Sequence, residues 1–402
     1  MVSTNLNGVA SGTRGELYLL ALEKEKRGEK IIKLNTGNPA DFGFEMPRSV
    51  KEKLISTLDD ALGYSDVRGM IEAREAIYKY ESKMGVLATT PDDVFITNGV
   101  SEGASLTVSA LCSPGDEILL PTPCYALWAN VVKMSGGKCV FYECDETCGW
   151  MPSVENIKSK ITKRTKGIVV INPNNPTGAV YTRKVIEEIY KIARENSLVI
   201  FSDEIYDRLI ISDDEHIPAA SIGEDVLVLT LGGLSKSHCL CGFRAGWVVV
   251  SGPEDKRCEV GSALLTLSAI RMCSNTVMQL VIPTALEDIE YTAQMIARDG
   301  RVYRQTTLAY ELLSKIDGIT LAKSNAAFYL YPRLELDRFD ISSDIDFAKK
   351  LLLEENILVV AGNGFLASDS SHFRLVALQS EEELTLAIKR IAAFLDRHRL
   401  NK

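Results

Sequence analysis

Short apolar segments alternate with amphipathic segments through the middle of the chain. Residues 167–171, 198–202 and 226–230 are apolar almost throughout, which is typical of strands buried on both faces. Further elements are expected as strands at 93–97, 117–121 and 247–250 and as a helix at 101–111. This alternation of strands and helices predicts a large α/β domain with a mostly parallel sheet.

The two ends of the chain contain a second set of predicted elements. These are helices at 14–27, 47–62, 68–84, 289–314 and 381–398, strands at 328–331, 357–360 and 373–376, and a short strand within 31–39 that ends in a glycine turn. Because a chain of 402 residues exceeds the size at which one core stops growing, we expect two domains. We assign residues 47–288 to the large domain and 289–402 to a smaller α/β domain, which residues 1–46 join.

Composition and charge narrow the range of partners. Charged residues make up 25% of the chain and hydrophobic residues 46%, as in folded globular proteins. The net charge of −9, without a lysine or arginine block, argues against a nucleic acid or an anionic membrane as partner. The sequence contains neither a leader pattern nor a membrane-length apolar run, so we expect a cytoplasmic protein. Nine cysteines fit neither a disulfide framework nor a zinc site, so we interpret most of them as small buried thiols and expect a structural role for Cys239 and Cys241.

A lysine and an arginine lie between two predicted strands at residues 231–247. Lys236 follows the run that ends at Thr230, and Arg244 precedes the strand at 247–250. Ligands bind at such strand ends in open α/β sheets. A lysine amine kept neutral by burial and nearby cations can form a Schiff base, and the fork of Arg244 suits a phosphate. Although each residue alone is more often structural, the pair suggests pyridoxal phosphate.

Two charged side chains lie within or directly after apolar strands. Asp203 follows the run at 198–202, where a buried carboxylate needs a cation unless it caps the next turn. Arg374 lies inside the strand at 373–376 and needs an anion, which is either a structural carboxylate or a ligand.

Two other strand ends carry candidate ligand-binding residues. Val100 and Ser101 begin a predicted helix, whose N-terminal amides either bind a phosphate or are capped by Asn98 or Ser101. Tyr125 and Trp128 follow another strand, where an aromatic ring stacks on a flat ligand or is buried. We choose Tyr125 as the stacking residue.

Three turns admit either a structural or a binding role. Gly37, before Asn38 and Pro39, lets the backbone approach a ligand closely or makes an ordinary turn. The segment 172–178 is a turn that needs no function. Tyr64 lies in a glycine-rich loop, where a tyrosine usually packs.

Together these segments resemble the fold-type I, pyridoxal-phosphate-dependent aminotransferases of class I and II, and most of all the bacterial alanine (glutamate-pyruvate) aminotransferases. The similarity runs from about Arg14 to the C-terminus with the motifs in the family order, and the spacing from Asp203 to Lys236 agrees. The resemblance implies a large α/β/α domain with a seven-stranded, mostly parallel sheet, a smaller α/β domain and pyridoxal 5'-phosphate as cofactor.

The matching positions imply roles toward the cofactor. Lys236 would form the Schiff base and then transfer the α-proton as base and acid. Asp203 would keep the ring nitrogen protonated, Tyr125 would stack on the ring, and Asn175 and Tyr206 would bind its phenolic oxygen. The residues implied at the phosphate are Val100, Ser101, Glu102 through its amide, Ser235, Arg244 and, from the other subunit of a homodimer, Tyr64.

The resemblance also implies how the amino acid and 2-oxo acid substrates bind. Arg374 and Asn175 would hold the α-carboxylate, and Gly37 would contact the substrate. Arg14 or Arg271 would bind the distal carboxylate of glutamate and 2-oxoglutarate. The implied reaction is ping-pong transamination between L-alanine and 2-oxoglutarate, which gives pyruvate and L-glutamate.

Two positions depart from related patterns. Gly233 replaces a phosphate-binding hydroxyl residue of the aspartate-type enzymes, although the alanine-type enzymes share the glycine, and Ser11 stands where alanine-type enzymes carry a tyrosine. Alternative functions are therefore an aminotransferase for aromatic or branched-chain amino acids and a carbon-sulfur lyase, since one fold hosts several reactions. A cofactor-binding regulator would require a fused DNA-binding segment.

Overall fold

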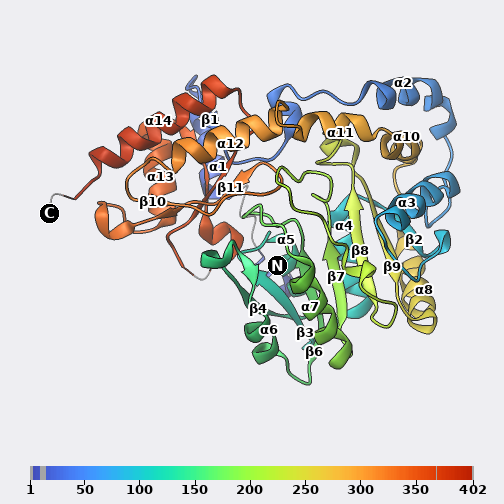
Figure 1. Ribbon diagram of the computed structural model, residues 1–402. Helices are drawn as coiled ribbons and strands as arrows, with labels where there is room; N and C mark the ends of the chain where they lie inside the picture. The colour runs from blue at the N-terminus through green and yellow to red at the C-terminus, as the bar shows by residue number, and fades with distance from the viewer. Residues whose placement is uncertain (1–2, 10–14, 368, 401–402) are drawn as a thin grey trace.

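The computed structural model describes residues 3–9, 15–367 and 369–400. An eight-stranded sheet lies at its centre, with the strand order β2-β9-β8-β7-β6-β3-β4-β5 (Figure 1). The strands are β2 (Val94–Asn98), β3 (Glu117–Thr122), β4 (Lys138–Asp145), β5 (Met151–Pro152), β6 (Thr165–Ile171), β7 (Val199–Asp203), β8 (Val228–Gly233) and β9 (Ala245–Ser251). In this spatial order, the first seven strands, β2 at one edge through β4, form the predicted seven-stranded sheet. The two-residue β5 adds an eighth strand beside β4.

Strand direction brings many strand ends to one edge of the sheet. β3, β4, β6, β7 and β8 are parallel to one another. β9 is antiparallel to both neighbours, β2 and β8, so β2 runs in the same direction as the parallel strands. The carboxyl ends of β2, β3, β6, β7 and β8 and the beginning of β9 therefore share one edge, which is where ligands bind in open α/β sheets.

Both faces of the central sheet are covered by helices. Within β6, Ile168 and Val170 face the hydrophobic cluster that contains α6 (Val154–Lys160) and α7 (Arg183–Glu195). Val169 and Ile171 face the opposite cluster, to which α4 (Val100–Leu111), α5 (Leu127–Met134) and α8 (Glu254–Ile270) contribute. Burial on both faces explains why the predicted strand runs contain no polar alternation.

Helices also cover the β2 and β9 side of the sheet. They are α2 (Arg48–Thr57), α3 (Ile71–Lys83), α9 (Thr276–Gln279) and α10 (Ile282–Glu287). Val50, Ile77 and Ala285 from these helices belong to the same hydrophobic cluster as Val249 of β9. This packing confirms the predicted helix at 68–84, while the predicted helix at 47–62 ends as α2 at Thr57 and continues as a 3-10 turn.

The long helix predicted at 289–314 is wrong, because the chain forms two helices there. α11 (Ile289–Ile296) and α12 (Arg301–Leu313) are separated at residues 297–300. Gly300 lies so close to the carbonyl oxygens of Gln294 and Met295 that a Cβ at this position would overlap them. The glycine therefore allows a close backbone approach between the two helices, which the hydrophobic period does not indicate.

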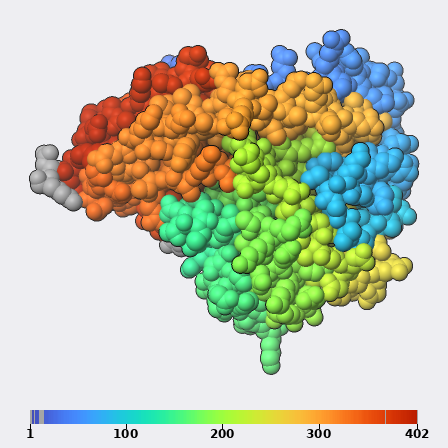
Figure 2. Space-filling model, viewed as in Figure 1, coloured from blue at the N-terminus to red at the C-terminus, as the bar shows by residue number. Residues whose placement is uncertain are grey.

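The C-terminal part forms a smaller layer of strands and helices. Its remaining elements are β10 (Ile319–Thr320), β11 (Tyr329–Leu330), β12 (Arg333–Leu334), α13 (Asp344–Glu355), β13 (Ile357–Leu358), β14 (Val360–Ala361), β15 (Phe373–Val376) and α14 (Glu381–Arg397). The rings of Phe347, Phe373 and Phe394 pack together in its core. In the space-filling view this orange and red part lies across the top of the green and yellow part (Figure 2).

The N-terminal segment packs on the C-terminal part. Its strand β1 (Ile32–Lys33) pairs in parallel with β13, and its helix α1 (Glu16–Lys26) packs near α13. The domain boundaries at residues 46 and 288 stay predictions. No helix in the described ranges is long and apolar enough to cross a membrane.

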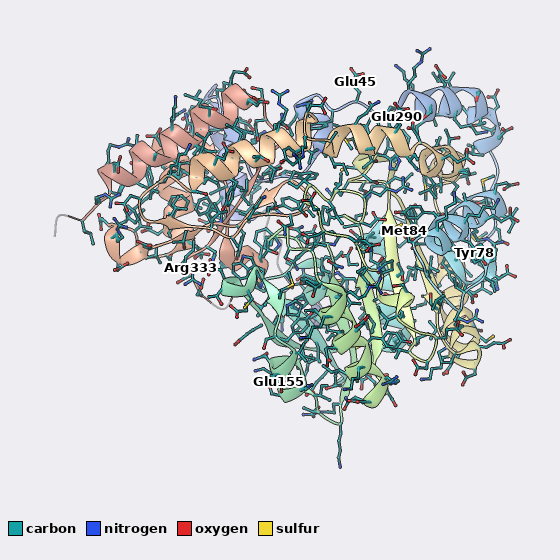
Figure 3. The ribbon with its side chains drawn as sticks, in the orientation of Figure 1. Glu45, Tyr78, Met84, Glu155, Glu290 and Arg333 are labelled. Carbon is teal, nitrogen blue, oxygen red and sulfur yellow. The ribbon has the colours of Figure 1, made fainter. Side chains whose placement is uncertain are left out.

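An ion pair and an aromatic contact join the C-terminal part to the region beyond β4. Arg333 Nη2 lies 2.5 Å from Glu146 Oε2, and Figure 3 shows Arg333 where these two parts meet. The rings of Trp150 and Tyr331 meet edge to face with centroids 5.5 Å apart. A half-exposed ion pair stabilises by at most about 1 kcal/mol, so the buried aromatic contact is the stronger link.

Candidate active site

One cavity of about 1110 Å³ opens at the carboxyl edge of the central sheet. Typical small-molecule sites measure roughly 300–1,000 Å³, so this cavity has room for a cofactor together with a small substrate. The predicted site residues that line it are Gly37, Val100, Ser101, Tyr125, Asn175, Asp203, Tyr206, Ser235, Lys236, Arg244 and Arg374. Among the described residues, Tyr64 and Glu102 do not line it. Arg14, also predicted here, lies outside the described residues.

Lys236 lies in the loop between β8 and β9, with its amine close to the N-terminal segment. Its Nζ donates a hydrogen bond of 2.6 Å to the Gly37 carbonyl oxygen and lies 3.7 Å from Cys241 Sγ. Burial disfavours the ammonium, but Tyr329 and Cys241 favour it when they ionise, and the pKa of Lys236 is raised. The predicted depression of this pKa by nearby cations is wrong, because Arg374 has the weakest influence among these groups.

The start of α4 and the guanidinium of Arg244 lie against each other. Gly99, directly before α4, has a φ of 81°, and a Cβ there would overlap the Arg244 guanidinium. Arg244 Nη1 donates to Ser235 Oγ at 3.4 Å, and its Nη2 donates to the Asn98 carbonyl oxygen at 3.3 Å. A helix N-terminus, a hydroxyl and a cation thus converge on one region, which is the donor set that binds a phosphate.

Glu102 directs its carboxylate away from this region. Its Oε2 accepts the Asn98 N–H at 2.7 Å, and its Oε1 lies 3.0 Å from Arg271 Nε. Its own N–H donates to the Gly99 carbonyl oxygen at 3.1 Å. The role of the Glu102 amide at a phosphate therefore stays a prediction, and Arg271 is already paired with a carboxylate of its own protomer.

Asp203 ends β7 in a buried position. Its Oδ2 accepts a 2.9 Å hydrogen bond from Trp128 Nε1, and the Ile205 N–H donates to its Oδ1 at 3.4 Å. Both donors are neutral, and burial raises the pKa of Asp203 to about 6. A cation bound beside this carboxylate would stabilise its ionised form.

A hydrogen-bonded series of side chains runs from Tyr206 to Arg374. The hydroxyl groups of Tyr206 and Tyr329 lie 2.8 Å apart, and Asn175 Nδ2 donates to Tyr206 Oη at 3.4 Å. Arg374 Nη1 in turn donates to Asn175 Oδ1 at 3.0 Å. Burial raises the pKa of Tyr206, so its phenol is neutral and available as a donor. Asn175 therefore links Tyr206 to Arg374.

Arg374 is a buried cation whose described partners are all neutral. Besides Asn175, it donates through Nη2 to the Asn35 carbonyl oxygen. Its guanidinium carbon lies 4.6 Å from the centre of the Tyr329 ring and 4.7 Å from that of Phe365. Burial lowers its pKa. A charge in this position gains most from an anion, and the cavity it lines is where an anion can reach it.

Gly37 and Tyr329 fit each other closely. A Cβ on Gly37 would lie 2.5 Å from Tyr329 Oη, so the backbone reaches the cavity only because this residue is glycine.

Tyr64 lies outside the cavity and is 82% exposed. Its loop is held by the 3.0 Å hydrogen bond from Gln279 Nε2 to Ser65 Oγ.

Sequence reasoning missed several residues of the cavity or its wall. They are Asn35, Trp128 as a donor to Asp203, Tyr329, Cys241 and Gln379. The expectation that most cysteines are buried is wrong, because four of the nine are buried, Cys239 among them, and Cys241 is partly exposed and lines the cavity. The available signal was proximity, since Asn35 precedes Gly37 by two residues and Cys241 lies between Lys236 and Arg244.

The donor set of the cavity fits pyridoxal phosphate. Lys236 offers an amine for the aldehyde, the α4 start with Ser235 and Arg244 offers a phosphate site, and buried Asp203 has no cationic partner among the described residues. No group of three or more histidine, cysteine or acidic residues able to hold a metal ion occurs in the part of the chain that the structure describes.

Comparison with known proteins agrees with this geometry. The family model for aminotransferase class I and II matches residues 29–391. Glutamate-pyruvate aminotransferase AlaA of Haemophilus influenzae is 42% identical over 397 residues, which cover 99% of this chain and 98% of that protein. Alanine aminotransferase of Mycobacterium tuberculosis is 40% identical over 398 residues, covering 99% of this chain and 93% of that one.

Solved structures give the same result. An aminotransferase from Escherichia coli superposes with a TM-score of 0.97 and 39% identity, covering 100% of this chain and 99% of its own. Alanine aminotransferase from Pyrococcus furiosus gives a TM-score of 0.94 and 37% identity, with coverage of 99% and 100%.

The chain therefore belongs to the class I and II aminotransferases. It is a pyridoxal-phosphate-dependent transaminase of fold type I, as the sequence predicted.

Proposed function

We propose that this chain is an alanine transaminase, which transfers the amino group of L-alanine to 2-oxoglutarate and yields pyruvate and L-glutamate. The printed names of the relatives, glutamate-pyruvate aminotransferase and alanine aminotransferase, support this choice. The observation that carries the proposal is Arg374, a buried guanidinium with neutral partners, in the same cavity as Lys236. Substrates with a carboxylate beside the reacting carbon match this pair.

The two halves of the cavity have separate tasks. The cofactor half comprises Val100, Ser101, Tyr125, Asp203, Tyr206, Ser235, Lys236 and Arg244. The substrate half comprises Asn35, Gly37, Asn175, Tyr329, Arg374 and Gln379. When bound, pyridoxal phosphate supplies an aldehyde that condenses with amines and a cationic ring that withdraws electrons from the substrate Cα.

The residues of this chain orient the substrate and move one proton. Arg374 holds the α-carboxylate through its guanidinium fork, with Asn175 fixing its Nη1. Lys236 Nζ removes the proton from the substrate Cα as a general base and returns it on the cofactor side as a general acid. Because one cavity receives the amino acid and the 2-oxo acid in turn, the reaction is ping-pong.

A distal carboxylate distinguishes 2-oxoglutarate and L-glutamate from pyruvate and L-alanine. Of the two predicted partners, Arg271 is paired with Glu102, which favours Arg14. Arg14→Ala should raise the KM for 2-oxoglutarate much more than the KM for pyruvate. Equal effects on the two constants would exclude Arg14 from the site.

A homodimer completes this proposal. Tyr64 is exposed, and so are the nearby apolar side chains of Leu62 and Met272, with 90% and 53% of their surface open. A second subunit would cover these side chains and receive Tyr64 at its phosphate. Light scattering should give twice the mass of the chain, and Tyr64→Phe should weaken cofactor binding by about tenfold, the loss expected for one hydrogen bond to a charged group. The cytoplasm stays the predicted location.

The first test of the function is a single half-reaction. Purified enzyme loaded with pyridoxal phosphate is mixed with L-alanine alone, while cofactor absorbance and pyruvate are measured together. We expect the absorbance to change to that of pyridoxamine phosphate with about one pyruvate per site, as ping-pong kinetics requires. Unchanged absorbance with L-alanine but a change with aspartate or an aromatic amino acid would replace the substrate assignment. Ammonia release from a sulfur amino acid would indicate a lyase.

A further inference from the structure

Polar groups of three side chains in the substrate half have no hydrogen-bond partner among the described residues. They are both amide atoms of Asn35, the Nε of Arg374 and the Oε1 of Gln379. These side chains are almost fully buried, with 1%, 2% and 3% of the residue surface exposed. Because an unpaired buried polar group is costly, a bound ligand is the expected partner for such groups on residues that line a cavity.

Asn35 is held directly beside the guanidinium of Arg374. Its carbonyl oxygen accepts a hydrogen bond from Arg374 Nη2. The preceding residue, Leu34, accepts the Val376 N–H at 2.9 Å and buries its side chain in the core of the C-terminal part. The main chain at 34–35 is thus fixed against β15, and Asn35 is among the residues that line the same cavity as Arg374.

Asn174 and Asn35 differ in the hydrogen bonds of their side-chain amides. Asn174 is equally buried, at 1% exposed, but its Nδ2 donates to Tyr181 Oη at 3.2 Å and its Oδ1 accepts the Thr177 hydroxyl at 2.9 Å. Both amide atoms of Asn174 therefore stabilise a turn. In contrast, neither amide atom of Asn35 forms a hydrogen bond with a described residue.

We propose that Asn35 is a substrate-binding residue whose side-chain Nδ2 donates a hydrogen bond to the carboxylate that Arg374 holds. This inference rests on the proposed function, because it requires substrates with a carboxylate beside the reacting carbon. A neutral amide suits the position, since it adds a donor and leaves the positive charge of Arg374 to the substrate. An aspartate at residue 35 would instead provide Arg374 with an internal anion that competes with the substrate.

Two variants of the loaded enzyme test this role. Asn35→Leu removes the hydrogen bond at similar volume, and Asn35→Asp keeps the shape but adds the competing charge. The readouts are kcat, the KM values for L-alanine and 2-oxoglutarate, and the dissociation constant of propionate, an unreactive carboxylate, measured by calorimetry. Asn196→Asp, at the exposed end of α7, is the control for an added negative charge.

We expect Asn35→Leu to raise both KM values and the propionate dissociation constant by about tenfold, with kcat within about threefold, because the contact binds ground state and transition state alike. Asn35→Asp should raise all three constants by about a hundredfold, and Asn196→Asp should leave them unchanged. Propionate binding within twofold of the wild type in Asn35→Asp overturns the inference, even if Asn35→Leu fails to fold. If Arg374→Lys also binds propionate normally, the proposed function itself fails.

Discussion

The cofactor half and the substrate half of the cavity satisfy their polar groups in different ways. In the cofactor half, Arg244 donates to Ser235, Cys241 and Asn98, and Asp203 accepts from Trp128. In the substrate half, Arg374 Nε and the Asn35 amide have no partner among the described residues. The half that keeps its ligand through every turnover is thus built with internal bonds. The half that binds and releases a ligand in each half-reaction keeps donors free for it.

The largest expected effect comes from removing the group that joins the two halves. Lys236→Ala should reduce turnover by at least about 10⁴-fold, since the variant lacks the amine that transfers the α-proton. Steady-state assays with L-alanine and 2-oxoglutarate measure this loss. The bound cofactor should also lack the absorbance of its lysine-linked form. Transamination at the wild-type rate would exclude Lys236 as the reacting amine.

Substrate binding should weaken when Arg374 is replaced by lysine, which keeps the positive charge but lacks the two-pronged guanidinium. We expect Arg374→Lys to raise the KM for L-alanine and for 2-oxoglutarate by about a hundredfold, because an ammonium cannot bind a carboxylate with two parallel bonds. Cofactor affinity, measured by fluorescence titration, should change less than about threefold. A comparable loss of cofactor affinity would contradict the separation of the two halves.

The cofactor half should show a dependence on pH that originates at Asp203. Its pKa of about 6 exceeds the roughly 3.9 of an unfolded chain, so its contribution to stability is lost as pH rises through 6. A cationic ring bound beside the ionised carboxylate reverses this penalty. Cofactor affinity should therefore rise between pH 5 and 6, by up to about tenfold per unit.

The matched variant for this pH dependence is Asp203→Asn. Its affinity for the cofactor should be lower at pH 8 and should lack the component that titrates near pH 6. Because the cofactor phosphate also titrates, the difference between wild type and variant is the relevant quantity. Identical pH profiles for the two proteins would show that Asp203 does not meet a cation.

The smallest effect is expected at the partner of Asp203. Trp128→Phe removes the indole donor and retains most of the buried ring volume. Losing this bond to the carboxylate should weaken cofactor binding by about threefold to tenfold and shift the pH midpoint upward by less than about one unit. KM values should not change, and a substrate effect as large as the cofactor effect would argue against the division of the cavity.

The sequence was most informative where function depends on strand ends. The apolar runs before Asp203 and Lys236 predicted the neighbouring strands β7 and β8, and parallel pairing brings Asp203 opposite Leu231. Local pattern therefore sufficed to place much of the cofactor half. It failed at residues 297–300, where the close approach of Gly300 to two carbonyl oxygens interrupts a continuous helical period.

The substrate half was harder to predict because its contacts are remote in sequence. Arg374 and Asn35 are hydrogen-bonded although 339 positions separate them. Arg374 was found through its apolar neighbours and the family resemblance, but the one local signal for Asn35 was its position two residues before Gly37. The raised pKa of Lys236 likewise depends on Tyr329, which reaches it only through tertiary packing.

The parallel pairing of β1 with β13 has a consequence for how the protein is made. Ile32 pairs with Ile357, so the segment that carries Asn35 and Gly37 cannot dock until residue 357 has left the ribosome. Residues 94–251, which contain the central sheet, leave the ribosome much earlier and can begin to fold first. The phosphate and lysine region can therefore form before the segment with Asn35 and Gly37 docks, so the ability to hold the cofactor can precede the ability to select a substrate.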